Sequence, residues 1–489
     1  MDYVTHEIPR WRIVYGQYQG VEKTAVNELY RLVQRWTPYV VTVEAAERFS
    51  PEAWEGHVLY IGTLEDNCHL AGLADQGLFR PESRREGYAL KVMDAPRGGG
   101  KKLAVLQGAD GPGVLWAVRD FLHLYLQERR YDGYLYYNRF TPFVESMPDF
   151  ERRSAPKVEN RGLWSWGHVI YDYKGYIDNM SRWKLNCLIV WNDFAPLNAG
   201  EVVEYAHSRG VKVVWGFSWC WGEPVDPNSP EELEKWTRRA YETYRDQYSH
   251  LGGDGIYFQT FTETADTRIG GRSIAQLACL WVNTISRRLL EAYPDLWIQF
   301  GVHASSIKGE WASFREIDPR ISIVWEDVGD RPGGCFPYAY DPRNQENFAA
   351  AKDYTAGLLA LRGEKEDYGA VLKGFTVLNW ERFEHQKGPF VMGEADPVFI
   401  RQRTEEKAYL WKFALPYWQE NAGRLQEYLR LVADAPIARR TVTALVEDGL
   451  WEAASWYPAV LLAELLWDWD RDLKELITAL THCEDVRMA

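Results

Sequence analysis

The strongest constraint on the fold is a regular alternation of strand and helix patterns that begins near residue 160. Each apolar run of strand type is followed by a helical pattern and a short connection, which is typical of a parallel sheet. The expected strands are residues 163–170, 187–191, 211–219, 255–263, 296–302, 321–325 and 371–379, with 389–392 as a weaker eighth candidate. Because the repetition is unbroken, a closed (β/α)8 barrel of the TIM type fits better than an open sheet.

The segments on either side of this pattern differ from it. Residues 1–150 contain shorter strand and helix patterns, which predict a small α/β domain, and residues 142–156 form a linker with proline and charge. Residues 157–397 are assigned to the barrel. Residues 398–489 carry helical patterns only, including 437–446, so we expect a helical C-terminal region.

The composition argues against several classes of partner. The formal net charge of −14 repels phosphate backbones, so we expect no nucleic-acid partner. There is no signal-peptide pattern and no apolar window of about 18 residues, so we expect no membrane partner. The six cysteines are scattered, with Cys187, Cys220 and Cys279 inside apolar elements, which suggests free thiols in a reducing cytoplasm. A homodimer is one possible oligomeric state, which the sequence does not decide.

One glycine-rich stretch needs a separate interpretation. Gly108, Gly111 and Gly113 follow a strand of the first domain, but their spacing matches neither common nucleotide-binding loop. We therefore expect a tight turn from strand to helix there.

Polar and aromatic side chains gather at the carboxyl ends of the expected barrel strands, where barrel enzymes place their reactive groups. The carboxylates are Asp193, Glu263, Glu326, Asp327 and Glu381. The accompanying side chains are Trp166, Trp191, Asn192, Trp219, Trp221, Gln259, His303, Trp325, Asn379 and Trp380. Surface charges placed independently would not favour one end of successive strands, so we expect a functional site.

Carboxylates and tryptophans without Cys/His metal spacing favour glycoside chemistry. One carboxylic acid must protonate the leaving oxygen, and a second carboxylate must activate water or attack the sugar. Indole rings suit sugar faces. The chain contains neither G-x-S-x-G nor HExxH, and we expect no cofactor.

Three points stay open at this level. The carboxylates could hold a hard cation, as in a metal-dependent lyase or isomerase. The chain could also be a non-catalytic carbohydrate-binding protein on a degenerate barrel. His303 could bind a sugar hydroxyl or carboxylate, or it could be a structural histidine.

Two stretches resemble known glycosidases. The run Met180-Ser-Arg-Trp-Lys-Leu-Asn-Cys-Leu-Ile-Val-Trp191 resembles the opening of the barrel in family 20 and family 84 hexosaminidases and family 67 alpha-glucuronidases. The stretch that begins Glu86-Gly-Tyr-Ala-Leu-Lys-Val and ends at Leu122 resembles the small α/β domain that precedes those barrels. The resemblance implies a glycosidase that acts on glucuronosyl or N-acetylhexosaminyl oligosaccharides.

The resemblance also implies roles for individual residues. Family 67 enzymes use a fourth-strand Glu as the acid, with an Asp and a Glu on later strands as the base pair. This implies Glu263 as the acid and Glu381, with Asp327 or Glu326, as the base. Gly252-Gly253-Asp254 looks like the Gly-Gly-Asp-Glu of family 20, but it precedes the strand and Gly255 replaces the Glu. We therefore do not expect it to be catalytic.

Overall fold

The computed structural model describes residues 10–36, 41–96, 98, 100–126, 147–307, 309–328, 344–375, 386, 388–446 and 450–488. The chain divides into two compact units: residues up to Pro156 with the short segment His207–Gly210, and the remainder. The first unit extends past residue 150 because β6 (Phe150–Ser154) is an edge strand of its sheet, although the sequence pattern predicts a linker there.

A closed barrel of parallel strands forms the centre of the second unit, which confirms the predicted (β/α)8 fold. In barrel order the strands run β10-β13-β14-β15-β16-β7-β8-β9, and β9 pairs with β10 again. The barrel strands are β7 (Asn160–Trp166), β8 (Cys187–Trp191), β9 (Lys212–Gly216), β10 (Gly255–Gln259), β13 (Ile298–Val302), β14 (Ile321–Val328), β15 (Asp367–Leu372) and β16 (Arg439–Leu445).

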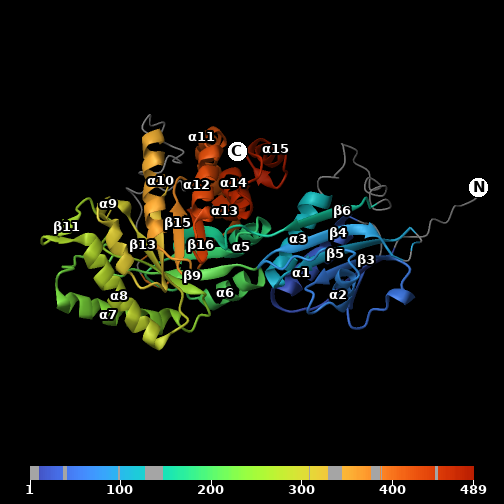
Figure 1. Ribbon diagram of the computed structural model, residues 1–489, viewed down its shortest axis with the longest axis horizontal. Helices are drawn as coiled ribbons and strands as arrows, with labels where there is room; N and C mark the ends of the chain where they lie inside the picture. Colours follow the sequence, from blue (N-terminus) through green and yellow to red (C-terminus); the bar gives the residue numbers. More distant parts are fainter. Residues whose placement is uncertain are drawn as a thin grey trace, which may run out of the picture. The chain divides into compact units, whose positions relative to one another are not determined.

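The eighth strand comes from a segment whose pattern predicts a helix, and that prediction is wrong. Within 437–446 the structure has β16, which pairs with β15, its labelled neighbour in Figure 1, and with β7 on its other side. Residues 441–445 are all buried, so both faces of this strand are covered, as is usual in a parallel barrel. The barrel therefore extends beyond residue 397, and the weaker candidate 389–392 is not a strand.

Amphipathic helices pack around the barrel strands and bury their apolar faces against them. These helices are α5 (Tyr173–Arg182), α6 (Ala199–Ser208), α7 (Pro230–Thr243), α8 (Ile274–Ala292), α9 (Ala304–Ile307) and α10 (Asn344–Leu361). Helix α8 begins after Ser273, whose hydroxyl accepts a hydrogen bond from the Gln276 N–H and so caps the helix. This fixes the loop between β10 and α8, which carries Glu263.

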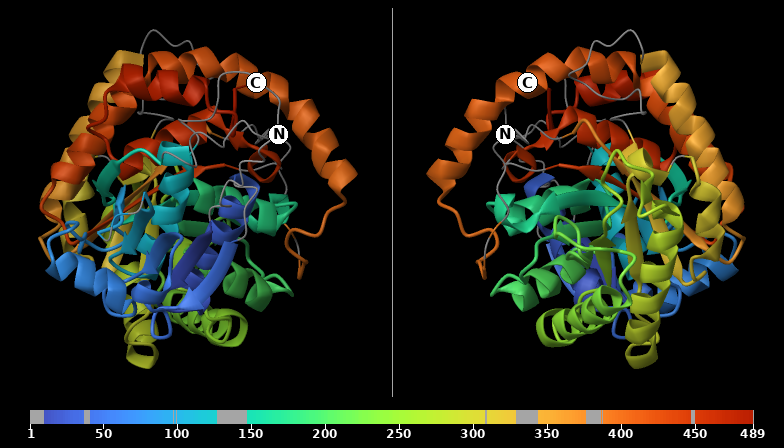
Figure 2. Two further views of the ribbon diagram at one scale, coloured as in Figure 1. Left: turned by 90° about the vertical axis from the view of Figure 1, so that its right-hand side faces the viewer. Right: turned by 90° about the vertical axis from the view of Figure 1, so that its left-hand side faces the viewer.

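The C-terminal helices lie together on the barrel unit in every view (orange to red in Figure 2). They are α11 (Pro397–Glu420), α12 (Ala422–Asp434), α13 (Leu450–Ala453), α14 (Tyr457–Trp467) and α15 (Leu473–Thr481). Helix α14 is buried over almost its whole length, in keeping with its apolar sequence. Of the helices described, none combines the length and apolarity needed to cross a membrane.

The first unit is a small α/β domain, as predicted. Its sheet has the order β2-β1-β3-β5-β4-β6. Its elements are β1 (Trp11–Tyr15), α1 (Gly20–Trp36), β2 (Val41–Ala45), β3 (His57–Gly62), α2 (Cys68–Asp75), β4 (Tyr88–Asp94), β5 (Lys102–Gly108) and α3 (Gly111–Asp120), with β6. The glycines after β5 form a tight turn: a Cβ on Gly108 would lie 2.2 Å from the Val114 nitrogen.

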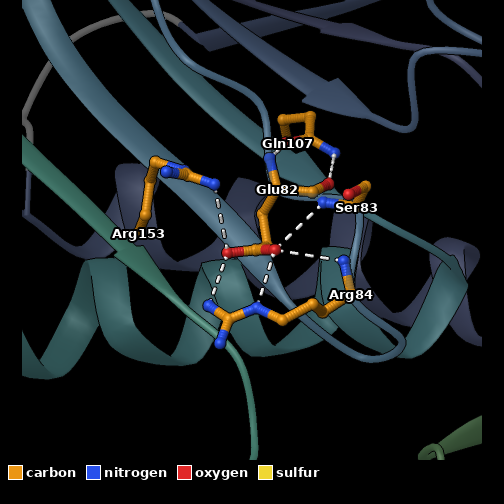
Figure 3. Close-up of polar contacts among 5 residues, drawn as sticks. All are labelled: Glu82, Ser83, Arg84, Gln107 and Arg153. Carbon is orange, nitrogen blue, oxygen red and sulfur yellow. Dashed lines mark hydrogen bonds and ion pairs between the residues drawn. The ribbon is translucent and has the colours of Figure 1, made fainter.

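A buried carboxylate joins three parts of this first sheet (Figure 3). Glu82 accepts hydrogen bonds from the side chain of Arg84 and from the backbone N–H groups of Ser83 and Arg84, and Arg153 of β6 lies 3.5 Å away. The Glu82 backbone exchanges hydrogen bonds with the Gln107 side chain of β5. The Arg84 guanidinium lowers the pKa of Glu82 to about 2. The acceptor positions of Glu82 are used within the fold, so this group is structural.

Three cysteines of the barrel unit are buried free thiols, as the sequence pattern predicts. Cys187, Cys220 and Cys279 form no disulfide. Burial raises the pKa of each thiol to about 12, which makes them unreactive core residues.

Candidate active site

Three neighbouring strands bring the central polar residues together. The strands β10, β13 and β14 are adjacent in the barrel. Glu263 lies in the loop after β10, His303 directly follows β13, and Glu326 lies near the end of β14. The carboxyl ends of parallel strands meet at one face, so residues far apart in the chain form one cluster.

Glu263 is the accessible carboxylate of this cluster. Its side chain is 51% exposed. The indole Nε1–H of Trp221 donates a hydrogen bond to Glu263 Oε2 at 2.6 Å. The same oxygen lies 3.7 Å from His303 Nε2. Glu263 is thus held by an aromatic donor while remaining open to solvent.

Glu326 is the buried carboxylate, with only 1% of the residue exposed. The hydroxyl of Tyr257 and the amide of Gln259 donate to it, and His303 Nε2 lies 3.3 Å from its Oε2. Burial works to raise the pKa of Glu326, but the nearby His303, the Lys373 charge and the Tyr257 hydrogen bond together lower it to about 2. These interactions favour the ionised form of Glu326.

The geometry limits the distance between the two carboxylates. His303 Nε2 lies 3.7 Å from Glu263 Oε2 and 3.3 Å from Glu326 Oε2. These two oxygens are therefore at most about 7 Å apart, compared with roughly 5–5.5 Å between carboxyl groups in retaining glycosidases and 6.5–9.5 Å in inverting ones.

Four tryptophans pack against one another here, and three of them contact Tyr257 or Glu263. The ring centroids of Trp164 and Trp191 lie 6.0 and 6.1 Å from that of Tyr257. Trp166 packs edge-on against Trp191 at 5.8 Å, and Trp221 does so at 6.0 Å. We call Trp164, Trp166, Trp191 and Trp221 the tryptophan cluster. It joins the predicted site residues Trp166, Trp191 and Trp221 to Glu263.

Two predicted site tryptophans lie elsewhere, in the core between the barrel and its helices. Trp219 stacks on Phe258 with ring centroids 3.5 Å apart. Trp325 contacts Tyr354 of α10 at 4.7 Å. Successive strand residues face opposite sides, so Trp325 faces the helices because its neighbour Glu326 faces the barrel interior. We therefore leave Trp219 and Trp325 out of the site.

The remaining predicted residues divide into two groups. Asn192 and Asp193 stabilise turns beyond β8: Asn192 Oδ1 accepts from the Phe194 N–H at 3.1 Å, and Asp193 Oδ1 accepts from the Ser218 N–H at 3.3 Å. Asn379, Trp380 and Glu381 lie outside the described residues, as does the side chain of Asp327. Their roles stay predictions.

The sequence pattern misses two contributors to the site. Tyr257 precedes Gln259 by two residues on β10 and so shares its inward face, a signal that the sequence did contain. Lys373 directly follows β15, and its Nζ lies 5.9 Å from the Trp164 ring. Its position directly after an apolar strand was the feature of the sequence that could have identified it as a site residue.

Metal binding receives no support from the part of the chain that is described. Among those residues, no group of three or more His, Cys, Asp or Glu side chains is arranged so that it could hold a metal ion. The carboxylates at the strand ends instead interact with His303, Trp221, Tyr257 and Gln259.

In structure, the chain is similar to solved glycoside hydrolases of the hexosaminidase type. A beta-N-acetylhexosaminidase from Bacteroides fragilis NCTC 9343 is 11% identical over 97% of this chain and 90% of its own, with a TM-score of 0.48. The Flavobacterium johnsoniae chitobiase is 12% identical over 98% and 70%, with a TM-score of 0.43. A family 89 glycoside hydrolase from Clostridium perfringens is 10% identical over 94% and 50%, with a TM-score of 0.45.

Comparisons by sequence give no match. No family model matches the chain, and no curated protein matches it. The closed strand pairing, and not these similarities, establishes the barrel.

Proposed function

We propose that this protein is a glycoside hydrolase that cleaves a glycosidic bond of an oligosaccharide at the carboxyl end of its barrel. The observation that carries the proposal is the environment of Glu263: exposed, hydrogen-bonded to Trp221 and 3.7 Å from His303 Nε2. A solvent-accessible carboxyl group can reach the glycosidic oxygen of a bound sugar, and the indole of Trp221 beside it offers a surface for the sugar's apolar face.

In the proposed reaction, Glu263 enters as the carboxylic acid. It transfers its proton to the glycosidic oxygen as the bond between that oxygen and the anomeric carbon breaks. A second carboxylate either removes a proton from the water that adds to the anomeric carbon, or attacks that carbon and is later displaced by water. One water is consumed and no cofactor is needed. The candidates for this second group are Glu326, Asp327 and Glu381.

The substrate class follows from the sequence resemblance. N-acetylhexosaminides and glucuronosides are the two groups to examine first. Trp164, Trp166 and Trp191 are buried, so Trp221 is the ring of the tryptophan cluster that can face a sugar. It is compatible with either sugar, since ring stacking depends on the apolar face of the sugar rather than on one substituent.

The test is a panel of chromogenic aryl glycosides and glucuronyl oligosaccharides with wild-type protein and Glu263→Gln. We expect hydrolysis by the wild type and a loss of roughly 10²–10⁴-fold in kcat in the variant, with folding intact by circular dichroism. Asp266→Asn is the control, because Asp266 is an exposed acid of the same loop. We expect it to keep full activity.

Three outcomes would overturn parts of the proposal. Near-normal activity of Glu263→Gln would reject the acid role. Thermal stabilisation by sugars without hydrolysis would favour the carbohydrate-binding alternative. Activity that disappears with EDTA would favour a metal-dependent reaction.

A further inference from the structure

Two side chains of β10 form hydrogen bonds with Glu326 of β14, although another strand lies between β10 and β14. Tyr257 and Gln259 belong to β10, Glu326 belongs to β14, and β13 lies between them. Neighbouring strands are about 4.8 Å apart, so these residues start from backbones roughly 10 Å apart. Their hydrogen bonds must therefore pass over β13 on the inside of the barrel.

Gly301 of β13 makes this crossing possible. A Cβ at this position would lie 2.1 Å from Glu326 Oε1 and 2.2 Å from the Tyr257 hydroxyl. Both distances are far below van der Waals contact, so a side chain at 301 would displace the Tyr257–Glu326 pair. The glycine is thus a structural requirement of this hydrogen bond.

Both oxygens of Glu326 are occupied within the protein. Oε1 accepts from Tyr257, and Oε2 accepts from Gln259 and lies 3.3 Å from His303 Nε2. The residue is also almost completely buried. A nucleophile or base must reach the anomeric carbon or a water molecule, and a buried carboxylate with these partners meets neither condition.

We propose that Glu326 is a positioning residue which, held by Tyr257 and Gln259, fixes the imidazole of His303 beside Glu263. The inference rests on the proposed function and deepens it. Within the described part of the chain, Glu326 from β14 and Glu263 from the loop after β10 carry charges near the imidazole, and Lys373 after β15 acts on Glu326. The base role is thereby left to Asp327 or Glu381.

This arrangement gives His303 a defined task. When Glu263 gives its proton to the leaving oxygen, a negative charge forms on its carboxylate. An imidazolium with Nε2 3.7 Å from that carboxylate stabilises the charge, and the carboxylate of Glu326, whose Oε2 lies 3.3 Å from the same nitrogen, favours the imidazolium. Glu326 therefore acts through His303 and not on the substrate.

The first experiment measures the state of His303 directly and needs no substrate. In protein labelled with ¹⁵N-histidine, the His303 signals are assigned by their disappearance in His303→Gln. We expect Tyr257→Phe and Glu326→Gln to shift the His303 nitrogen signals toward those of neutral imidazole. Tyr368→Phe should leave them unchanged, because Tyr368 is a buried barrel tyrosine in the outer core. Unchanged signals in Tyr257→Phe and Glu326→Gln would overturn the proposal.

The second experiment separates a positioning residue from a nucleophile. We expect kcat to fall roughly 10-fold in Tyr257→Phe, the cost of one hydrogen bond to a buried charge, with KM nearly unchanged. With azide, Glu326→Ala should form no glycosyl azide. Formation of that product would place Glu326 at the anomeric carbon and overturn the proposal.

The two experiments fail independently. If no glycoside is hydrolysed, the proposed function fails, and the histidine signals still decide whether Glu326 and Tyr257 hold His303. Tyr257→Phe keeps the carboxylate in place, so it remains informative if the Glu326 variants do not fold.

Discussion

Trp219 and Trp221 lie two residues apart after β9 and have different environments. Trp219 is stacked on Phe258 in the core between the barrel and its helices, with an interplanar angle of 10°. Trp221 donates its indole N–H to the exposed carboxylate of Glu263 at 2.6 Å. One tryptophan therefore contributes to packing, and the other contacts the proposed acid.

This difference predicts that replacing Trp by Phe lowers activity at position 221 and stability at position 219. Trp221→Phe removes one donor near the surface, so we expect kcat to fall several-fold while the free energy of unfolding changes by less than about 0.5 kcal/mol. Trp219→Phe leaves a cavity in a packed core and should cost roughly 1–3 kcal/mol of stability. Urea denaturation and aryl glycoside kinetics measure both quantities. Equal loss of stability in the two variants would contradict the assignment.

The role of Glu263 as an acid predicts a dependence on the leaving group. A dinitrophenolate leaves without protonation, whereas an alkoxide needs a proton. The activity of Glu263→Gln, expressed relative to wild type, should therefore be far higher on dinitrophenyl glycosides than on methyl glycosides. The measurement is kcat/KM over a series of leaving groups for both proteins. An equal loss across the series would indicate that Glu263 binds the sugar without transferring a proton.

The space occupied by the Tyr257–Glu326 pair predicts a stability effect at Gly301. Gly301→Ala places a methyl group about 2 Å from both oxygens, and such overpacking should cost roughly 1–3 kcal/mol. Gly309→Ala is the matched control, because a Cβ there meets no atom within 4 Å. Chemical denaturation of the two variants provides the comparison. A fully stable Gly301→Ala would show that the pair can move aside.

A buried carboxyl group in the first unit predicts a pH effect on stability. Burial, followed by the charge of Asp66 and a hydrogen bond with it, raises the pKa of Glu22 from 4.5 to about 8. The folded state thus prefers neutral Glu22, and this contribution is complete below pH 4.5 and lost as the pH rises toward 8. Wild-type stability should fall over this interval, and Glu22→Gln should reduce that fall.

Thermal unfolding between pH 4 and 9 measures the Glu22 effect. Glu47→Gln serves as a control on the surface of the same unit, since Glu47 is exposed. The control should follow the wild-type curve. If Glu22→Gln follows it as well, the neutral state assigned to Glu22 is incorrect.

The position of Glu263 just after a barrel strand could be predicted from the sequence, but not which of the predicted tryptophans lie beside it. Glu263 follows an apolar strand and opens a polar loop, a pattern that marks a strand end in any barrel. Which tryptophans face the site depends on the side of the backbone, and the strand boundary must be known to one residue before alternation can be used. Trp325 was therefore predicted as a site residue although it is adjacent to Glu326 and faces the other way.

The eighth strand shows the same limitation at the level of the fold. Arg439 and Arg440 at its start resemble the polar face of a helix, yet each pairs with a carboxylate, Asp367 on β15 and Glu159 just before β7. Those partners are distant in the chain, and a local pattern carries no information about them. Six strands could therefore be located from local sequence, and the seventh was predicted too late in the chain, at 371–379 rather than Asp367–Leu372. The eighth could be identified only from the closed barrel.

The late position of β16 also bears on how the chain is made. Asn160 on β7 donates a hydrogen bond to Thr441 on β16 across 281 positions of sequence. During synthesis, β7 and β15 therefore remain unpaired sheet edges until β16 has been made, close to the end of the chain. Unpaired edges can pair with other chains and so promote aggregation. A chain stopped before residue 439 should aggregate on release, which sedimentation of translation products can measure. Folding of this barrel is thus expected to follow synthesis rather than to accompany it.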